Sequence, residues 1–225
     1  MIPLYDTIPS AKKPYVMYSI ILANIAVFIY ELTLNPIQLK AFMFEYGLVP
    51  ARYTVGYFRD LLGFSLIPWF THMFLHGGWG HIIGNMWFLW IFGDNVEDAF
   101  GHLKFLAFYI TGGLFAAFFH FLTMAKAPIP MVGASGAISA VMGAYFVLFP
   151  YSRIVSLVFL FFFFTLVAIP AYFYLLIWFL MQVFNGLADT VRFYGSGVAW
   201  WAHAGGFIFG MIVGGRVRKR YYWYM

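Results

Sequence analysis

The chain has 225 residues, of which 64% are hydrophobic and only 9% are charged. Soluble globular domains carry about 25% charged residues, so this composition excludes a soluble globular class and indicates a membrane protein. The formal net charge is +5, and the basic residues are dispersed among apolar runs. This distribution excludes a nucleic-acid-binding face and favours the lipid bilayer as a partner. The absence of cysteine excludes disulfides, thiolate nucleophiles and cysteine-ligated metal sites.

The apolar runs predict an all-α, polytopic membrane protein that forms a single domain over residues 1–225. A helix needs about 20 apolar residues to cross a hydrocarbon core of about 30 Å. The expected spans cover approximately residues 15–34, 78–94, 103–124, 134–150, 165–185 and 198–214. The acidic cluster from Asp94 to Asp98 is expected to close the second span. The sequence therefore predicts a bundle of six transmembrane helices.

Two connections differ from ordinary short loops. Residues 36–76 mix aromatic and charged side chains, which is typical of a long loop that lies at the membrane interface between the first and second spans. Residues 154–186 are continuously apolar, too long for one straight span and too short for two. We expect the helix in the later part of this stretch. Phe159 to Phe164 would then form a buried or interfacial approach, with Pro170 as a kink.

The distribution of lysine and arginine predicts the orientation of the bundle. Six spans place both termini on one side, and most basic residues then fall on that side, which the positive-inside rule assigns to the cytoplasm. Spans two, four and six therefore enter from the outside, with their first turns at one depth. These turns carry His81 and Asn85, Ser135, and His203. Polar groups in hydrocarbon are costly unless they face a protein interior or a watery cavity, so their convergence favours a functional site.

The segment that carries Ser135 consists mostly of residues with small side chains. Nine of the twelve residues from Gly133 to Ala144 are Gly, Ala or Ser. Small residues let membrane helices approach each other closely. The sixth span has a matching stripe at three- and four-residue steps, formed by His203, Gly206, Gly210 and Gly214. Direct contact between Ser135 and His203 is therefore sterically feasible.

Ser135 and His203 fit the roles of nucleophile and general base in acyl transfer. A serine hydroxyl is a poor nucleophile until a neighbouring base, most often histidine, accepts its proton. Asn85 offers an amide NH₂ group and His81 a ring N–H group to stabilise the developing oxyanion. The nearest acidic residues by depth are Glu31 and Asp189. Neither is convincingly placed to orient the base, so we expect a Ser-His dyad instead of a Ser-His-Asp triad.

In order and spacing, these residues resemble those of the rhomboid family of intramembrane serine proteases. Residues 133–136, Gly-Ala-Ser-Gly, resemble the nucleophile motif of the family, and residues 202–206, Ala-His-Ala-Gly-Gly, are similar to its histidine helix. His76, His81 and Asn85 match the spacing of its second-span motif, whose later two positions are associated with the oxyanion hole. The resemblance implies a six-helix bundle that hydrolyses peptide bonds in or near transmembrane segments of other membrane proteins, with no metal or cofactor.

The chain departs from the family pattern at two places. Many relatives have a Trp-Arg pair in the first long loop, where this chain has Pro68-Trp69. Some bacterial members carry an aromatic residue one turn after the nucleophile, where this chain has Ser139. We expect the first difference to affect the anchoring of the loop and the second to affect how His203 is held.

Alternative interpretations stay open at this point. A Gly-x-Ser-Gly segment alone is more often packing than catalysis, His81 and Asn85 also fit interhelical hydrogen bonding, and His76 fits a loop contact equally well. His72, His102 and His120 are expected to be structural or interfacial. The alternative functions are a catalytically inactive rhomboid-like protein that binds membrane helices and, less favoured, a small transporter. The intact serine and histidine argue against the first, and the absence of an internal repeat argues against the second.

The location of the protein is predicted only in outline. No cleavable signal peptide is evident, and the absence of a long N-terminal extension favours a prokaryotic cytoplasmic membrane. In that setting both termini are cytoplasmic and the site opens to the outer side.

Overall fold

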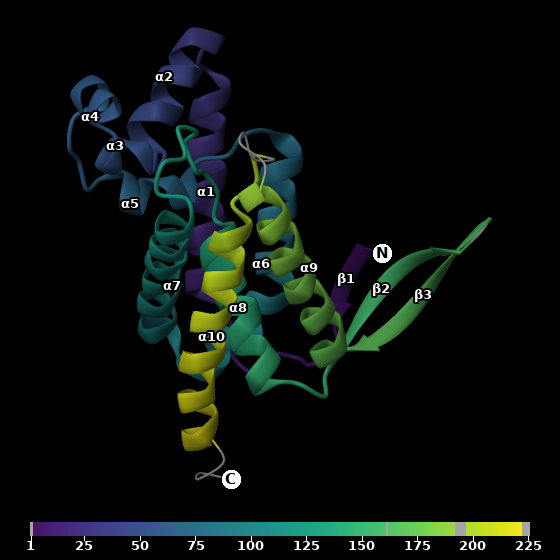
Figure 1. Cartoon of the computed structure of the whole chain (residues 1–225). Helices are drawn as coiled ribbons and strands as arrows, with labels where there is room; N and C mark the ends of the chain where they lie inside the picture. Colours follow the sequence, from purple (N-terminus) through teal and green to yellow (C-terminus); the bar gives the residue numbers. More distant parts are fainter. Residues whose placement is uncertain (1, 161, 192–196, 222–225) are drawn as a thin grey trace.

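The computed structural model describes residues 2–160, 162–191 and 197–221, and most of them are helical (Figure 1). The long helices in this part of the chain are α1 (Tyr15–Leu32), α6 (Trp79–Phe100), α7 (His102–Thr123), α8 (Ser135–Leu148), α9 (Ala171–Val191) and α10 (Trp200–Tyr221). Among the described residues, α1, α7 and α9 are long and apolar enough to cross a membrane by length and composition. α8 is equally apolar but shorter, while α6 and α10 carry charged residues near their C-terminal ends.

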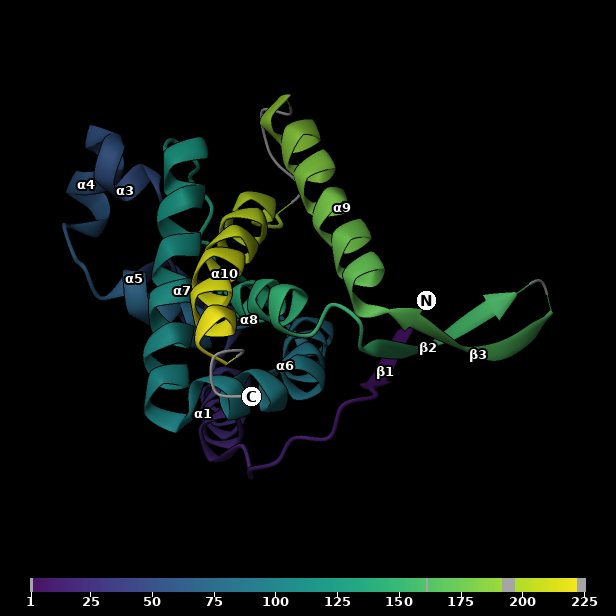
Figure 2. The same cartoon turned by 90° about the horizontal axis from the view of Figure 1, so that it is seen from below.

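α8 lies at the centre of the bundle, where α6, α7, α9 and α10 pack against it (Figures 1 and 2). Every residue from Gly136 to Tyr145 is buried. A Cβ atom at Gly210 of α10 would lie 1.9 Å from the carbonyl oxygen of Ala140, and a Cβ atom at Gly143 of α8 would lie 2.0 Å from that of Phe207. The backbones of α8 and α10 are thus in direct contact. The close approach of these two helices, predicted from the small residues around Ser135 and from the stripe His203, Gly206, Gly210 and Gly214, is confirmed.

α6 continues through the acidic cluster instead of ending at it. Glu97 is only 1% exposed, and its carboxylate accepts hydrogen bonds from the backbone nitrogens of Val16 (3.0 Å) and Met17 (2.7 Å) at the start of α1. These N–H groups belong to the first turn of a helix and have no partner within it. α6 ends before Gly101, whose φ of 78° favours glycine. The expectation that the acidic residues close this helix was wrong, because Glu97 is paired inside the protein.

The connection between α1 and α6 contains several short helices, at one end of the bundle (Figure 1). They are α2 (Pro36–Tyr46), α3 (Ala51–Thr54), α4 (Gly56–Leu62), α5 (Pro68–Thr71) and the 3-10 turn η1 (His72–Phe74). Arg52 is completely buried, and its guanidinium donates a hydrogen bond to the carbonyl oxygen of Glu45 (3.3 Å). The ring of Tyr53 contacts the rings of Trp69 and of Phe121 on α7. Arg52 and this aromatic cluster therefore attach the loop, which lacks the Trp-Arg pair of many relatives.

The all-α expectation was wrong for one region, because the structure contains a three-stranded antiparallel sheet. Its strands are β1 (Ile2–Asp6), β2 (Arg153–Leu160) and β3 (Phe163–Pro170), in the order β1-β2-β3. Residues 165–170, expected at the start of the fifth span, belong to β3. Pro170 is not a kink within a helix but the last residue of this strand, and α9 begins directly after it. Proline disfavours a helical conformation in the residue before it, which explains this boundary.

The β2–β3 hairpin projects from the bundle beside α9 (Figure 1). At its outer end Phe159 pairs with Phe164, and the side chains of both are mostly exposed. The inner end is fixed by β1, where Asp6 accepts a hydrogen bond from the hydroxyl of Tyr145 on α8. Burial raises the pKa of Asp6 to about 6. The N-terminal strand is therefore tied to the same helix that carries Ser135.

Candidate active site

The segment before Ser135 is held in a backbone conformation that favours glycine. Gly133 has a φ of 119°, and a Cβ atom at this position would lie only 2.5 Å from His81 Nε2. Its backbone nitrogen donates a hydrogen bond to the carbonyl oxygen of His72 (2.8 Å). Both the dihedral angle and the contact with the histidine ring therefore require glycine. This turn places Ser135 at the first position of α8 and brings the ring of His81 next to it.

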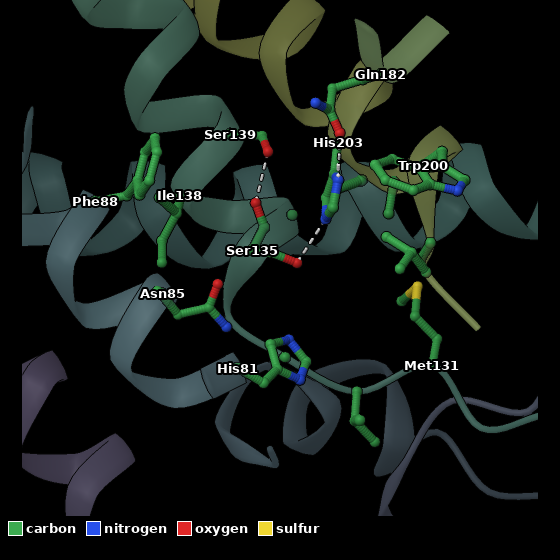
Figure 3. A pocket seen from close by; sticks show the side chains of 18 of the residues that line it. His81, Asn85, Phe88, Met131, Ser135, Ile138, Ser139, Gln182, Trp200 and His203 are labelled. Carbon is green, nitrogen blue, oxygen red and sulfur yellow. Dashed lines mark hydrogen bonds between the residues drawn. The ribbon is translucent and has the colours of Figure 1, made fainter. Parts of the chain in front are cut away.

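Ser135 and His203 are in hydrogen-bond contact. Ser135 Oγ lies 2.8 Å from His203 Nε2, although the two residues come from different helices, α8 and α10 (Figure 3). Ser139 does not hold the histidine, because its hydroxyl donates to the carbonyl oxygen of Ser135 one turn earlier (2.6 Å). The distance matches the hydrogen bond that a serine nucleophile makes with its base.

The second ring nitrogen of His203 contacts a residue that was not among the predicted site residues. Gln182 of α9 is only 5% exposed, and its Oε1 lies 2.9 Å from His203 Nδ1 (Figure 3). Only acidic residues were expected at this position. Of those, Glu31 accepts a hydrogen bond from the backbone nitrogen of His76, and Asp189 lines a neighbouring pocket. A polar amide within the apolar run of α9 was the signal that could have identified Gln182.

His81 and Asn85 are held by neighbouring groups. The backbone nitrogen of Gly77 donates to His81 Nδ1 (3.3 Å), so the ring proton of a neutral His81 lies on Nε2. Asn85 Nδ2 lies 2.9 Å from His76 Nε2, a contact that uses one of its two hydrogens. Each side chain thus keeps an N–H group for another acceptor. His76 fixes the orientation of Asn85.

A cavity of about 410 Å³ joins four of the five predicted site residues. Ser135, His203, His81 and Asn85 all line it, and Figure 3 shows them around one space. His76 is outside this lining, although it contacts Asn85. The cavity brings together a nucleophile, a base and two hydrogen-bond donors, which is the set of groups that acyl transfer needs.

The remaining histidines make contacts with other groups, although His72 also lines the cavity. His72 Nδ1 lies 2.9 Å from the carbonyl oxygen of Pro68, and His102 contacts the carboxylate of Glu97. These contacts agree with the structural roles expected for both. His120 is buried on α7 and lines the neighbouring pocket. Within the described ranges, no three His, Asp or Glu side chains are grouped so that they could hold a metal ion.

The fold and the site define an integral membrane protein whose central helix presents a serine in contact with a histidine. A family model described as the Rhomboid domain matches residues 63–220, which is well over half of the chain. The chain therefore belongs to the rhomboid family. The match includes every residue of the cavity described above.

Curated relatives with rhomboid names support this assignment. The chain is 33% identical over 102 residues to "Presenilin-associated rhomboid-like protein A, mitochondrial" of Danio rerio, an alignment that covers 43% of this chain and 27% of the relative. It is 34% identical over 90 residues to "Rhomboid protein 1, mitochondrial" of Saccharomyces cerevisiae, covering 38% of this chain and 26% of the relative. The matched region thus spans about a quarter of the length of these relatives.

Proposed function

We propose that this protein is an intramembrane serine endopeptidase that hydrolyses peptide bonds in or near transmembrane segments of other membrane proteins. The observation that carries the proposal is the 2.8 Å contact between Ser135 Oγ and His203 Nε2, in a cavity that also contains the side chains of His81 and Asn85. Membership of the rhomboid family supports the same class of reaction and substrate. The reaction needs no metal or cofactor in this proposal.

The mechanism follows from the donors and acceptors around Ser135. His203 Nε2 removes the hydroxyl proton while Ser135 Oγ bonds to the carbonyl carbon of the scissile peptide. Asn85 and His81 donate hydrogen bonds to the negatively charged oxygen that forms. His203 then returns the proton to the nitrogen of the leaving peptide, which departs and leaves an acyl-enzyme. A water molecule then gives a proton to His203 and bonds to the ester carbonyl carbon; the bond to Ser135 Oγ breaks, and His203 returns the proton to that oxygen.

In the membrane, we propose one domain over residues 1–225 that spans the bilayer six times, with both termini on the cytoplasmic side. The cavity then opens toward the outer side, where water reaches the acyl-enzyme. The distribution of lysine and arginine supports this orientation. The assignment to a prokaryotic cytoplasmic membrane stays a prediction, since the names of the two relatives place those proteins in mitochondria.

The test uses the purified protein in liposomes together with a single-span membrane protein as substrate. We expect the parent protein to cleave the substrate, and we expect Ser135→Ala and His203→Ala to lower kcat by a factor of about 10³ or more, since each removes a member of one catalytic unit. Equal cleavage by the parent and both variants would show that the activity does not depend on this site. Binding of the substrate without cleavage by the parent protein would favour an inactive helix-binding protein, and solute uptake by both variants would favour a transporter.

A further inference from the structure

The side-chain amide of Gln182 contacts the second ring nitrogen of His203. The amide is buried between two partners: Nε2 donates to the carbonyl oxygen of Trp178 one turn earlier (3.1 Å), and Oε1 lies 2.9 Å from His203 Nδ1. The first contact fixes the orientation of the amide, because a carbonyl oxygen accepts hydrogen bonds and repels another oxygen. The oxygen of Gln182 must therefore be the atom that faces the histidine.

An amide oxygen can only accept a hydrogen bond, so His203 Nδ1 must carry the ring proton. In a neutral imidazole the other nitrogen then has a free lone pair, and here that nitrogen is Nε2, which faces Ser135 Oγ. This is the tautomer that a general base needs. The opposite tautomer would direct an N–H group at the serine oxygen and could not remove its proton.

The aromatic side chains around His203 cannot replace the amide. The ring centroids of Trp178 and Trp200 lie 6.1 Å and 6.0 Å from that of His203. An indole offers only an N–H donor, so neither ring can accept the proton of Nδ1. The choice of tautomer therefore depends on Gln182.

We propose that Gln182 is a positioning residue that completes a Ser135–His203–Gln182 arrangement and selects the reactive tautomer of His203. The proposal rests on the proposed function, because it assigns a third member to the same site. In the Ser-His-Asp triad, a carboxylate has this role. A neutral amide does the same without placing a charge inside a membrane domain, where an ionised side chain is costly.

The experiment compares three variants of the 225-residue chain in liposomes. Gln182→Leu removes the acceptor, and Gln182→Glu keeps an acceptor oxygen at the same place. Asn185→Leu is the matched control, because Asn185 lies one turn further along α9 and its amide makes the same kind of hydrogen bond, to the carbonyl oxygen of Met181 (2.8 Å). The measurements are kcat and KM for a single-span substrate, the pH dependence of kcat, and the rate at which a fluorophosphonate labels Ser135.

We expect Gln182→Leu to lower kcat and the labelling rate by a factor of about 10 to 100, the loss expected when one partner of a buried hydrogen bond is removed, with KM changed by about twofold or less. Asn185→Leu should stay within about twofold of the parent, as is usual for substitutions away from the site. Gln182→Glu should recover most of the lost activity. In its protonated form the carboxyl group donates its O–H to the carbonyl oxygen of Trp178 in place of the amide, so the recovery should be largest at low pH and should fade as the carboxyl group ionises and turns a second oxygen toward that carbonyl.

The outcomes separate this proposal from the proposed function. If the parent protein shows no cleavage or labelling that depends on Ser135, the proposed function fails. If the parent is active and Gln182→Leu behaves like Asn185→Leu, or if Gln182→Glu is no better than Gln182→Leu, the positioning role is refuted while the protease function stands. His81 and His120 also act electrostatically on His203, and every variant keeps both.

Discussion

Replacing Gly210 with alanine perturbs the site from two turns away, without altering a residue of the cavity. A Cβ atom at this position would lie 1.9 Å from the carbonyl oxygen of Ala140, whereas ordinary van der Waals contacts of a Cβ begin at 3.4 Å. Both atoms belong to rigid helical backbone, so neither can move alone. α8 and α10 must separate by the difference, about 1.5 Å, over this turn.

The separation has a direct effect on the contact between Ser135 and His203, because the two residues lie on these two helices. If about half of the separation between the helices reaches the site, the distance from Ser135 Oγ to His203 Nε2 grows from 2.8 Å to beyond about 3.5 Å, the limit of a hydrogen bond. A misplacement of about 1 Å can cost a factor of about 10² in rate. Overpacking of this kind also costs about 1–3 kcal/mol of stability. We therefore expect Gly210→Ala to fold, to unfold at a lower temperature than the parent, and to lose about 99% of its activity.

Gly215→Ala is the control, since it makes the same chemical change on the same helix in open space, with no atom within 4 Å of the new Cβ. The assays are cleavage of a single-span substrate and thermal unfolding, both in one detergent. If Gly210→Ala cleaves as fast as Gly215→Ala, the contact between the backbones of α8 and α10 does not determine the geometry of the site.

Two further predictions concern the N-terminal strand and the membrane topology. Burial raises the pKa of Asp6 from 3.8 to about 6. Between these two pH values the folded state holds a proton that the unfolded state releases. The free energy of unfolding of the parent therefore falls as pH rises from about 4 to 6. Asp6→Asn should remove the contribution of Asp6 to this pH dependence, measured as the change in unfolding temperature between pH 4 and pH 6. An unchanged pH dependence would contradict the burial of the carboxyl group. Because the chain has no cysteine, Tyr151→Cys and Lys126→Cys can each be labelled alone in sealed vesicles with a membrane-impermeant maleimide. The proposed topology predicts that the two sites react from opposite sides, and labelling of both from one side would refute it.

The all-α expectation failed in a stretch where the local sequence pattern is ambiguous. From Ile154 to Pro170 the chain is apolar without a clear period of two or 3.6 residues, and such runs do not distinguish a strand from a buried helix. The decisive information lies elsewhere in the chain, since Asp6 of β1 pairs with Ile154 of β2. A pairing between segments almost 150 residues apart cannot be read from the composition of either one.

The sequence by itself determined the membrane class, the approximate positions of most long helices and four of the residues that line the cavity, Ser135, His203, His81 and Asn85. These features depend on local quantities: the length of apolar runs, the spacing of small residues along one helical face, and the polar groups that interrupt them. The contact of α8 with α10 also followed, because stripes of small residues on both helices allow their backbones to approach closely.

Only the tertiary structure decided which nitrogen of His203 faces Ser135 and what holds the other nitrogen. Gln182 lies on a helix whose rotation and depth are set by packing against α8 and α10 and by the β3 strand that leads into it. A single amide in an apolar helix gives no indication of its partner until that packing is known. The physical reason is that hydrogen bonds between side chains on different helices depend on the relative placement of the helices to within a fraction of an ångström, which local sequence does not encode.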